Sequence, residues 1–388
     1  MSDDVIDKLG DLAARAGLRR ISMLAWRDLD DPEAGGSEVH ASTVASLWGQ
    51  AGIEVTMRTS FAPGRAQVAW RDGYRVIRKA GRYMVFPRAA FSEMMGWHGA
   101  RDGLVEIWNG MPFFSPLWAR GPRVIWLHHL HGSMWQMTLP PRLAALGSSI
   151  ESRVAPPLYR GTPIVTLSES SKRELIEKLH LKPNRVTVVS PGVDPRFSPG
   201  GAKSEAPFVL AVGRLVPVKR FHLLIDALTE LKVRHPGLEA TIVGEGYLRD
   251  DLATQIREAG AQQWLQLRGH VDDDELVSLY RRAWVLCSAS AHEGWGMTIT
   301  EAAACGTPAI ATRIPGHADA IDQDHSGLLV DDPAAFAQTL ERVIADDRLR
   351  ARLTQGALDH AARFTWGATA YGTLEVLADE ALRRRSGT

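Results

Sequence analysis

Two acidic residues stand eight positions apart in the stretch HEGWGMTITEAAACGTP (292–308), at Glu293 and Glu301. Glycines follow Glu293 and predict a loop there, with a helix from about Thr298 to Gly306. Glu301 has two interpretations. It can close a capping box with Thr298, or its carboxylate can accept hydrogen bonds from a pair of ligand hydroxyls. Glu293 has no such local partner, and the free amides of the predicted helix start suit an anion.

Two cations, Arg214 and Lys219, fall in one turn of the stretch AVGRLVPVKRFHLLIDAL (211–228). The turn lies between a predicted strand and a predicted helix. A single lysine or arginine is usually a solvated loop charge. Two cations in the same strand-to-helix turn indicate binding of a phosphate or diphosphate.

A glycine pair, Gly35 and Gly36, opens a helical pattern in AGGSEVHASTVASLWGQAG (34–52). The glycines allow a ligand to approach the backbone, and Ser37 is a candidate helix cap. The pattern is neither a G-x-G-x-x-G fingerprint nor a P-loop. A plain helix start explains it equally well.

Three histidines, His128, His129 and His131, follow a predicted strand in VIWLHHLHGSMW (124–135). No zinc-site spacing fits them, and no cysteine is near. One histidine directed at a ligand as a hydrogen-bonding group is the favoured interpretation, with ordinary packing as the alternative. Which of the three it is stays open.

Residues 58–88 form a basic window with one acid, Asp72. This excess creates a local positive field that could contact anionic lipid head groups or an anionic acceptor, and the apolar run SEMMGW (92–97) follows it. A solvated face is the alternative. The window's cations are Arg58, Arg65, Arg71, Arg75, Arg78, Lys79, Arg82 and Arg88.

Short apolar runs rich in β-branched residues alternate with helical patterns from about residue 20 onward. This alternation predicts parallel sheets covered by helices on both faces, so the fold class is α/β. Predicted helices include 3–18, 222–235, 273–283 and the C-terminal segment. Predicted strands cover 20–26, 53–57, 74–78, 104–108, 123–127, 163–167 and 185–189, then 207–212, 239–243, 264–268, 284–288, 308–312 and 327–330.

The stretch SPGVDPRFSPGG (190–201) is rich in proline and glycine and separates two such halves. We therefore predict two doubly wound Rossmann-like domains facing across a cleft, over 1–194 and 195–365. Residues 366–388 form a last helix expected to pack back towards the N-terminal domain. Ligands of such sheets bind at the carboxyl ends of the strands.

The composition is that of an ordinary globular protein. Lys+Arg and Asp+Glu both number 45, which gives no reason to expect a nucleic-acid partner. Cys287 and Cys305 match neither a metal site nor a disulfide framework. The N-terminus lacks an apolar signal region, and no apolar run would span a membrane. We expect a cytoplasmic protein, with a peripheral position at the inner face of the plasma membrane as a further hypothesis.

Taken in order, these stretches resemble the family-4 glycosyltransferases, retaining enzymes with the GT-B fold. The likeness covers GGSEVH, the post-strand histidine of WLHHLH, SPGVDPRFSP, VGRLVPVK and EGWGMTITEAAACGTP. The last stretch looks like the E-x7-E signature of that family. Two positions depart from the family's usual residues. Trp295 stands where phenylalanine is common, and Arg220 stands where glycine is common and is expected to add charge near the donor.

The resemblance implies a nucleotide-sugar donor, UDP- or GDP-linked, held mainly by the second domain. Arg214 and Lys219 would neutralise its diphosphate, aided by backbone at Gly35 and Gly36, and Glu301 would hold the ribose. His128 would meet the sugar from the first domain. The sugar would be held by Glu293 and by the backbone of Gly294, Trp295, Gly296, Met297 and Thr298.

The implied activity is metal-independent hexosyl transfer, without a cofactor, to a hydroxyl of an envelope glycolipid, a polysaccharide or a small acceptor. The catalytic residues would be Glu293, His128, Arg214 and Lys219. A front-face reaction is implied, in which the leaving diphosphate takes the acceptor's proton. A sugar-nucleotide epimerase of similar architecture and a non-catalytic nucleotide-sugar binder are the alternatives.

Overall fold

The computed structural model describes residues 3–132 and 134–387, and it divides the chain into two compact units. The first unit joins residues 1–192 to 366–388, and the second covers 193–365. The predicted boundary lies two residues later. Val193 belongs with the second unit because its N–H donates to the carbonyl of Phe364 (3.1 Å) and it forms a bridge with Thr365.

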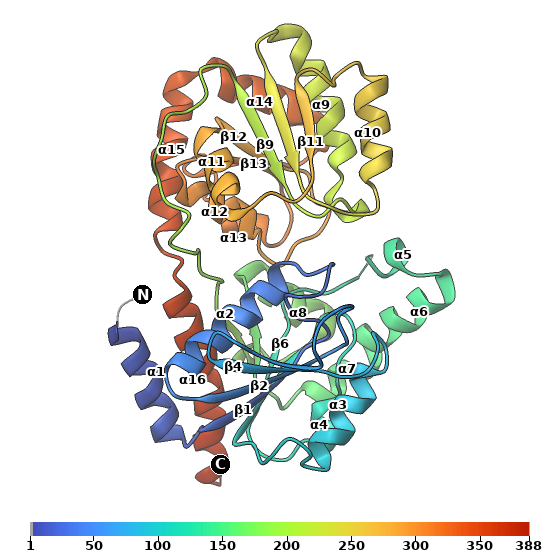
Figure 1. Cartoon of the computed structure of the whole chain (residues 1–388), viewed down its shortest axis with the longest axis vertical. Helices are drawn as coiled ribbons and strands as arrows, with labels where there is room; N and C mark the ends of the chain where they lie inside the picture. Colours follow the sequence, from blue (N-terminus) through green and yellow to red (C-terminus); the bar gives the residue numbers. More distant parts are fainter. Residues whose placement is uncertain (1–2, 133, 388) are drawn as a thin grey trace. The chain divides into compact units, whose positions relative to one another are not determined.

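The first unit is built on an eight-stranded sheet in the order β3-β4-β2-β1-β5-β6-β7-β8 (Figure 1). Strands β1 and β5 are buried almost throughout, as expected of parallel strands covered on both faces. The strands are β1 Arg20–Leu24, β2 Glu54–Thr59, β3 Val68–Arg71, β4 Tyr74–Arg78, β5 Gly103–Ile107, β6 Arg123–Trp126, β7 Ile164–Thr166 and β8 Val186–Val188.

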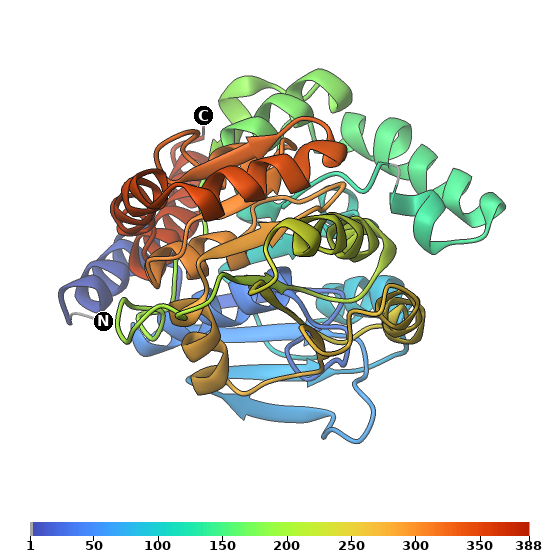
Figure 2. The ribbon, with the colours of Figure 1, turned by 90° about the horizontal axis from the view of Figure 1, so that it is seen from above.

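Helices lie on both faces of this sheet (Figures 1 and 2). On one face α1, α2 and α16 pack together, and α3, α4 and α7 contact one another in turn. The helices are α1 Asp3–Ala16, α2 Gly36–Gln50, α3 Val85–Met94, α4 Ser115–Trp118, α5 Met134–Thr138, α6 Pro141–Ser149, α7 Ala155–Tyr159, α8 Glu169–Leu179 and α16 Trp366–Arg385.

One strand of this sheet departs from the predicted all-parallel pattern. Strand β3 pairs with β4 in the antiparallel direction, through a two-residue turn at Asp72 and Gly73. Both turn residues have positive φ, 42° and 90°, which suits a hairpin whose sequence is Asp-Gly. The Asp-Gly pair between two β-rich runs was the signal that would have predicted it.

The C-terminal helix α16 packs within the first unit. The indole of Trp48 donates to the carbonyl of Ala370 (3.0 Å), and the hydroxyl of Thr369 donates to the carbonyl of Ser190 (2.8 Å). Helix α1 buries Leu9 and Ala16, as its periodicity predicts, and it contacts both α16 and α2.

The second unit has a six-stranded, all-parallel sheet in the order β11-β10-β9-β12-β13-β14. Its core joins buried side chains of α9, α14 and the central strands. The strands are β9 Phe208–Val212, β10 Glu239–Val243, β11 Leu265–Arg268, β12 Val285–Ser288, β13 Ala309–Thr312 and β14 Gly327–Val330. The helices are α9 Phe221–Arg234, α10 Arg249–Glu258, α11 Asp273–Arg282, α12 Met297–Ala304, α13 His317–Ala320, α14 Phe336–Ala345 and α15 Asp347–Ala361.

Candidate functional site

The strand order of the second unit brings two of the predicted loops together. Strand β9 lies between β10 and β12. After β9 the chain adds β10 and β11 on one side of it, and then crosses over to add β12, β13 and β14 on the other side. Ligands of doubly wound sheets bind at such a switch point, at the carboxyl ends of the strands. The turn 213–220 follows β9 and the loop 289–296 follows β12. They are joined by a hydrogen bond from the Ala291 N–H to the Val218 carbonyl (2.7 Å).

Lys219 and Glu293 form an ion pair between these two loops. The short 3-10 turn Pro217–Lys219 positions the ammonium, and the hydroxyl of Ser290 donates to the same carboxylate (2.9 Å). Burial tends to raise the pKa of Glu293, but the charge of Lys219, with His317 and the two hydrogen bonds, lowers it to about 2. The carboxylate is therefore ionised, and its charge is already partly satisfied.

Arg220 serves these loops in a way that the sequence did not predict. Its guanidinium donates to the backbone carbonyls of Ala289 (2.6 Å) and Ser290 (2.9 Å), and the expectation that it adds charge near the donor stays a prediction. The residue has a φ of 50°, a left-handed conformation that favours glycine. Arg220 thus ties the first loop to the second at the cost of an unfavourable backbone conformation.

His317, which sequence reasoning missed, lies behind Glu293. Its Nδ1 donates to the carbonyl of Thr312 (2.9 Å), and its Nε2 lies 3.3 Å from the hydroxyl of Ser288. Burial lowers its pKa to about 4, so the ring is neutral at pH 7. The preceding Gly316 has a φ of 88°, and a Cβ there would come within 2.6 Å of the Glu293 carbonyl oxygen. No spacing in the sequence signals this histidine, because its partners come from three other segments.

Glu301 does not cap its helix. Helix α12 begins at Met297 with Gly296 as its N-cap, so Thr298 is already inside the helix and the capping-box interpretation is wrong. The hydroxyl of Tyr280, from α11, donates to the carboxylate instead (2.9 Å). Burial raises the pKa of Glu301 to about 7, against the lowering effect of that hydrogen bond.

At the start of α12, the groups available to a ligand are backbone N–H groups and not side chains. The Trp295 ring is 4% exposed and packs edge-on against Phe364 at 5.0 Å, so its indole is part of the core. Met297 and Thr298 are the first two helical residues, whose N–H groups have no partner inside a helix. With Gly294, they make this loop a candidate anion-binding backbone.

Arg214 is half-buried in the turn after β9, and its carbonyl accepts from the Val216 N–H (2.9 Å). It therefore lies on the same loop as Lys219, at the carboxyl end of the first strand of this unit.

In the first unit, Gly35 and Gly36 lie at a corresponding switch point, since β1 lies between β2 and β5. Gly35 is the N-cap of α2, and its N–H donates to the Glu38 carboxylate (2.8 Å). Ser37 is not the cap. It lies inside the helix, and its hydroxyl accepts from the side chain of Asn109 (3.1 Å), which follows β5.

His128 is 4% exposed at the end of β6, and neither ring nitrogen has a hydrogen-bond partner among the described residues. Its ring meets that of His40 edge-on at 4.9 Å. Burial, together with His40, lowers the pKa of His128 well below its ordinary value, so the ring is neutral. His129 and His131 stack on each other instead, at 5.2 Å. His40 is the last residue of the GGSEVH stretch, but its contact with His128 could not be predicted from either motif.

The basic window is largely neutralised by acids outside it. The charge ratio counted within the window therefore overstates the local positive field. Asp28 and Asp30 pair with Arg71 and Arg78. The other paired cations of the window are Arg58 with Glu93, Arg65 with Asp30, and Arg82 with Glu33.

The described residues contain no group of three His, Cys, Asp or Glu side chains that could hold a metal ion. Both cysteines are buried thiols. None of the helices in the described ranges is long and apolar enough to cross a membrane.

The fold matches solved structures along nearly its whole length. Sucrose-phosphate synthase from Thermosynechococcus elongatus gives a TM-score of 0.79 at 18% identity, covering 95% of this chain and 99% of that one. A structure of HepE from Anabaena in complex with UDP-glucose gives 0.71 at 18% identity, covering 95% and 100%. WaaG, a glycosyltransferase involved in lipopolysaccharide biosynthesis, gives 0.73 at 16% identity, covering 92% and 99%.

Curated relatives are closer in sequence but match only in part. The D-inositol 3-phosphate glycosyltransferase of Stackebrandtia nassauensis is 35% identical over 246 residues, which cover 57% of this chain and 55% of the relative. That of Salinispora arenicola is 36% identical over 243 residues, covering 56% and 54%. The chain thus spans about half the length of the curated relatives that it matches.

Two family descriptions divide the sequence between them. The family described as "Glycosyltransferase Family 4" matches residues 34–197, and "Glycosyl transferases group 1" matches residues 194–360. The two matches meet at the proline- and glycine-rich linker. The chain therefore belongs to the group 1, family-4 glycosyltransferases, and its two parallel-sheet units have the GT-B fold.

Proposed function

We propose that this protein is a retaining hexosyltransferase that uses a nucleotide-diphosphate sugar, with UDP as the favoured carrier, and a hydroxyl acceptor. The observation that carries the proposal is the meeting of Lys219 with Glu293 at the switch point of the second unit, with Glu301 on the helix that follows. The UDP-glucose complex of HepE, which shares the fold, supports a uridine donor.

In this proposal the donor's diphosphate competes with Glu293 for the Lys219 ammonium. Negative charge builds on the diphosphate as the bond to the anomeric carbon breaks, and fixed cations aimed there lower the barrier. Arg214 and the backbone N–H groups of Gly294, Met297 and Thr298 add to this stabilisation. Gly35 and Gly36 are proposed to supply further backbone donors.

Glu293 is proposed to hold the sugar hydroxyls rather than to attack the anomeric carbon. A carboxylate whose pKa is lowered to about 2 by Lys219 and Ser290 is a weak nucleophile. This supports a front-face reaction, in which the leaving diphosphate oxygen accepts the acceptor's proton. Glu301 is proposed to accept from the ribose hydroxyls, and the neutral His128 to contact the sugar.

For the acceptor we propose an envelope glycolipid, a polysaccharide or a small polyol. WaaG takes part in lipopolysaccharide biosynthesis, and the curated relatives are named for inositol 3-phosphate. Contact with an anionic membrane surface through residues 58–88 stays a separate prediction. The exposed side chains of Met84, Phe91 and Trp97 support it, whereas the pairing of five cations in the window weakens its electrostatic part.

The first test is thermal stabilisation by UDP, GDP, ADP and CMP, followed by the matching nucleotide sugars. A ligand that binds only the folded state adds about 2.7 kcal/mol of stability at a hundred times its dissociation constant. We expect one nucleoside diphosphate to shift Tm, and Lys219→Ala to abolish the shift. Lys178→Ala removes an exposed lysine that is also paired with a glutamate, and it is the matched control.

Incubation with donor alone then separates the classes of function. A transferase slowly hydrolyses the nucleotide sugar, an epimerase converts it to an isomer, and a non-catalytic binder leaves it unchanged. A well-folded protein that responds to none of the nucleotides would refute the proposal.

A further inference from the structure

A pocket of about 360 Å³ lies at the carboxyl edge of the first unit's sheet, within the basic window and apart from the residues assigned to the donor. Its walls follow two neighbouring parallel strands, with Phe61 just after β2 and residues 79–81 just after β4. The two segments are joined by hydrogen bonds from Lys79 N–H to the Thr59 carbonyl (3.1 Å) and from Phe61 N–H to the Ala80 carbonyl (2.8 Å). The pocket lies at the same edge as the carboxyl ends of the strands, where doubly wound sheets bind ligands, but beside β2 and β4 and not at the switch point at β1.

Cations gather on one face of the sheet beside this pocket. Side chains alternate along a strand, so Arg75 and Lys79 point to the same face of β4. The register pairs Arg58 of β2 with Ile77, which puts Arg58 on that face too. Helix α3 contacts β2 and carries Arg88, another residue of the pocket wall.

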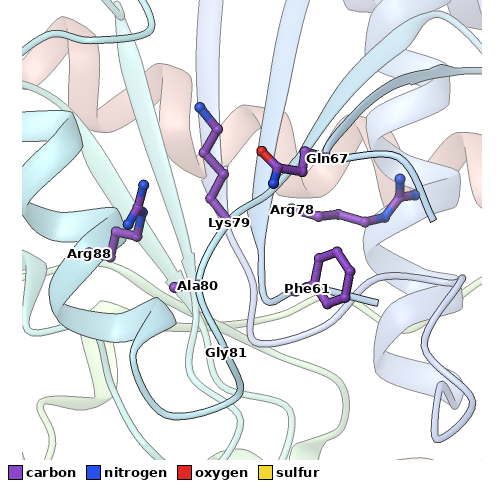
Figure 3. Close-up of a pocket in the computed structure, with 7 residues that line it drawn as sticks. All are labelled: Phe61, Gln67, Arg78, Lys79, Ala80, Gly81 and Arg88. Carbon is purple, nitrogen blue, oxygen red and sulfur yellow. The ribbon is translucent and has the colours of Figure 1, made fainter. Parts of the chain in front are cut away.

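Figure 3 shows Lys79 and Arg88 extending the same way from neighbouring segments, with the amide of Gln67 beside them. The Arg78 side chain runs in another direction, to its hydrogen bonds with Asp28 (2.6 Å and 2.9 Å). The pocket wall therefore contains Arg78, which Asp28 neutralises, and two cations, Lys79 and Arg88, whose side chains extend away from Arg78.

The charges of this cluster do not balance within the described residues. Glu93 is shared by Arg58 and Arg101. No described carboxylate comes within 4.0 Å of Arg75, Lys79 or Arg88, and the buried Nε of Arg75 has no acceptor there. Burial, and to a smaller extent the charges of Arg58, Lys79 and Arg75, lower the pKa of His98 to about 4.

We propose that Lys79 and Arg88, backed by Arg75, bind a phosphate ester carried by the acceptor. A phosphate group offers three acceptor oxygens and up to two charges, which matches several cations converging without a carboxylate. Gln67 adds an amide donor, and Phe61, which is 45% exposed, offers an apolar wall for the body of the acceptor. The acceptor part of this assignment rests on the proposed transferase function. The phosphate site itself stands on the pocket and its charges.

Binding of inorganic phosphate and glycerol 3-phosphate, measured by calorimetry, tests the site directly. The measurements are made in a Lys219→Ala background, so that the donor cluster cannot take up the anion. Adding Lys79→Met and Arg88→Gln together should weaken phosphate binding at least tenfold. Arg82→Gln is the matched control, because Arg82 is in the same window but pairs with Glu33. Equal phosphate binding with and without the double substitution would overturn the proposal.

Two further experiments identify the source of the phosphate and test whether the double substitution affects the donor site. Vesicles containing phosphatidylglycerol replace the soluble esters. A loss of vesicle binding in the double variant assigns the phosphate to a lipid head group, and a loss with glycerol 3-phosphate assigns it to a soluble acceptor. UDP binding and donor hydrolysis, measured with Lys219 intact, should not change in the double variant. If the unsubstituted protein neither binds UDP nor hydrolyses the donor, the transferase function is refuted. The phosphate-binding measurements still test the phosphate site independently.

Discussion

The two units each contain a group of cations, and the two groups differ in whether a carboxylate of the protein neutralises them. In the second unit, the Lys219 ammonium has its own counter-ion in Glu293. In the first unit, Arg75, Lys79 and Arg88 have none among the described carboxylates. A paired cation is positioned and can exchange its partner for a ligand. An unpaired cluster leaves like charges close together, which destabilises the fold until an anion arrives.

The largest expected effect is at the paired cluster. Lys219→Ala removes a fixed charge from the proposed leaving diphosphate, and loss of one such electrostatic contact typically lowers the rate by about 10²- to 10³-fold. The rate of sugar transfer, or of donor hydrolysis, measures it. Lys178→Ala should leave the rate unchanged, and a Lys219→Ala enzyme with nearly full activity would mean that the pair with Glu293 is only structural.

Arg220→Gly should separate positioning from charge in the same cluster. Glycine adopts the φ of 50° freely, which relieves strain of about 1–2 kcal/mol, but the carbonyls of Ala289 and Ser290 lose their donor. We expect near-normal thermal stability and roughly tenfold slower turnover, equivalent to about 1.4 kcal/mol in the barrier.

Arg220→Lys, which keeps one donor, should recover part of that rate. The split between kcat and the KM for the donor is the readout. If Arg220→Gly loses stability but keeps kcat, the residue is a packing element and not a positioning residue.

The pH dependence of donor binding should report on Glu301. Its pKa is raised from 4.5 to about 7, so the carboxylate is protonated at lower pH and cannot accept from both ribose hydroxyls. Affinity for the nucleoside diphosphate should fall as the pH drops below about 7.

Folding stability should change in the opposite direction. Between pH 4.5 and 7 the folded state keeps a proton that the unfolded state has released, so this group's contribution to stability declines as the pH rises through that window. Titrations of UDP binding and of Tm between pH 5 and 8, on the native protein and on Glu301→Gln, test both signs. Identical pH profiles for the two proteins would exclude Glu301 as their source.

The smallest effect should be at the unpaired cluster in the absence of ligand. Lys79→Met removes like-charge repulsion and should raise Tm at low salt by roughly 1–2 °C, from about 0.5 kcal/mol. Arg82→Met, which breaks the pair with Glu33, should give no such gain. Scanning calorimetry at low and high ionic strength measures both. A Tm gain that salt does not reduce would point to packing and not to charge.

Much of the fold could be predicted, because buried parallel strands read as apolar β-branched runs and the helices between them keep a regular period. The predicted strands 74–78, 239–243 and 327–330 match the structure residue for residue. The edge strand Val68–Arg71 was missed, since it is short and half-exposed and so lacks the apolar run of a central strand.

At the candidate site, the sequence indicated which loops hold the candidate residues. Lys219 and Glu293 each follow a predicted strand, and residues after parallel strands collect at one edge of a sheet. That the two charges meet depends on β9 lying beside β12, and strand order is set by packing between segments far apart in the chain. The same reason explains why the roles of Arg220 and His317 were not predicted.

Long-range contacts also bear on two of the alternatives that the sequence left open. The Glu301 carboxylate does not cap its helix, and it accepts a hydrogen bond from Tyr280, a residue 21 positions away. Five of the eight cations in the basic window pair with acids at positions 28–33 and at Glu93. The sequence pattern of a helix or strand reflects backbone hydrogen bonding and burial, which are properties of residues that are neighbours in the sequence. The pairing of charges reflects distances in space, and those are fixed only when the sheets assemble.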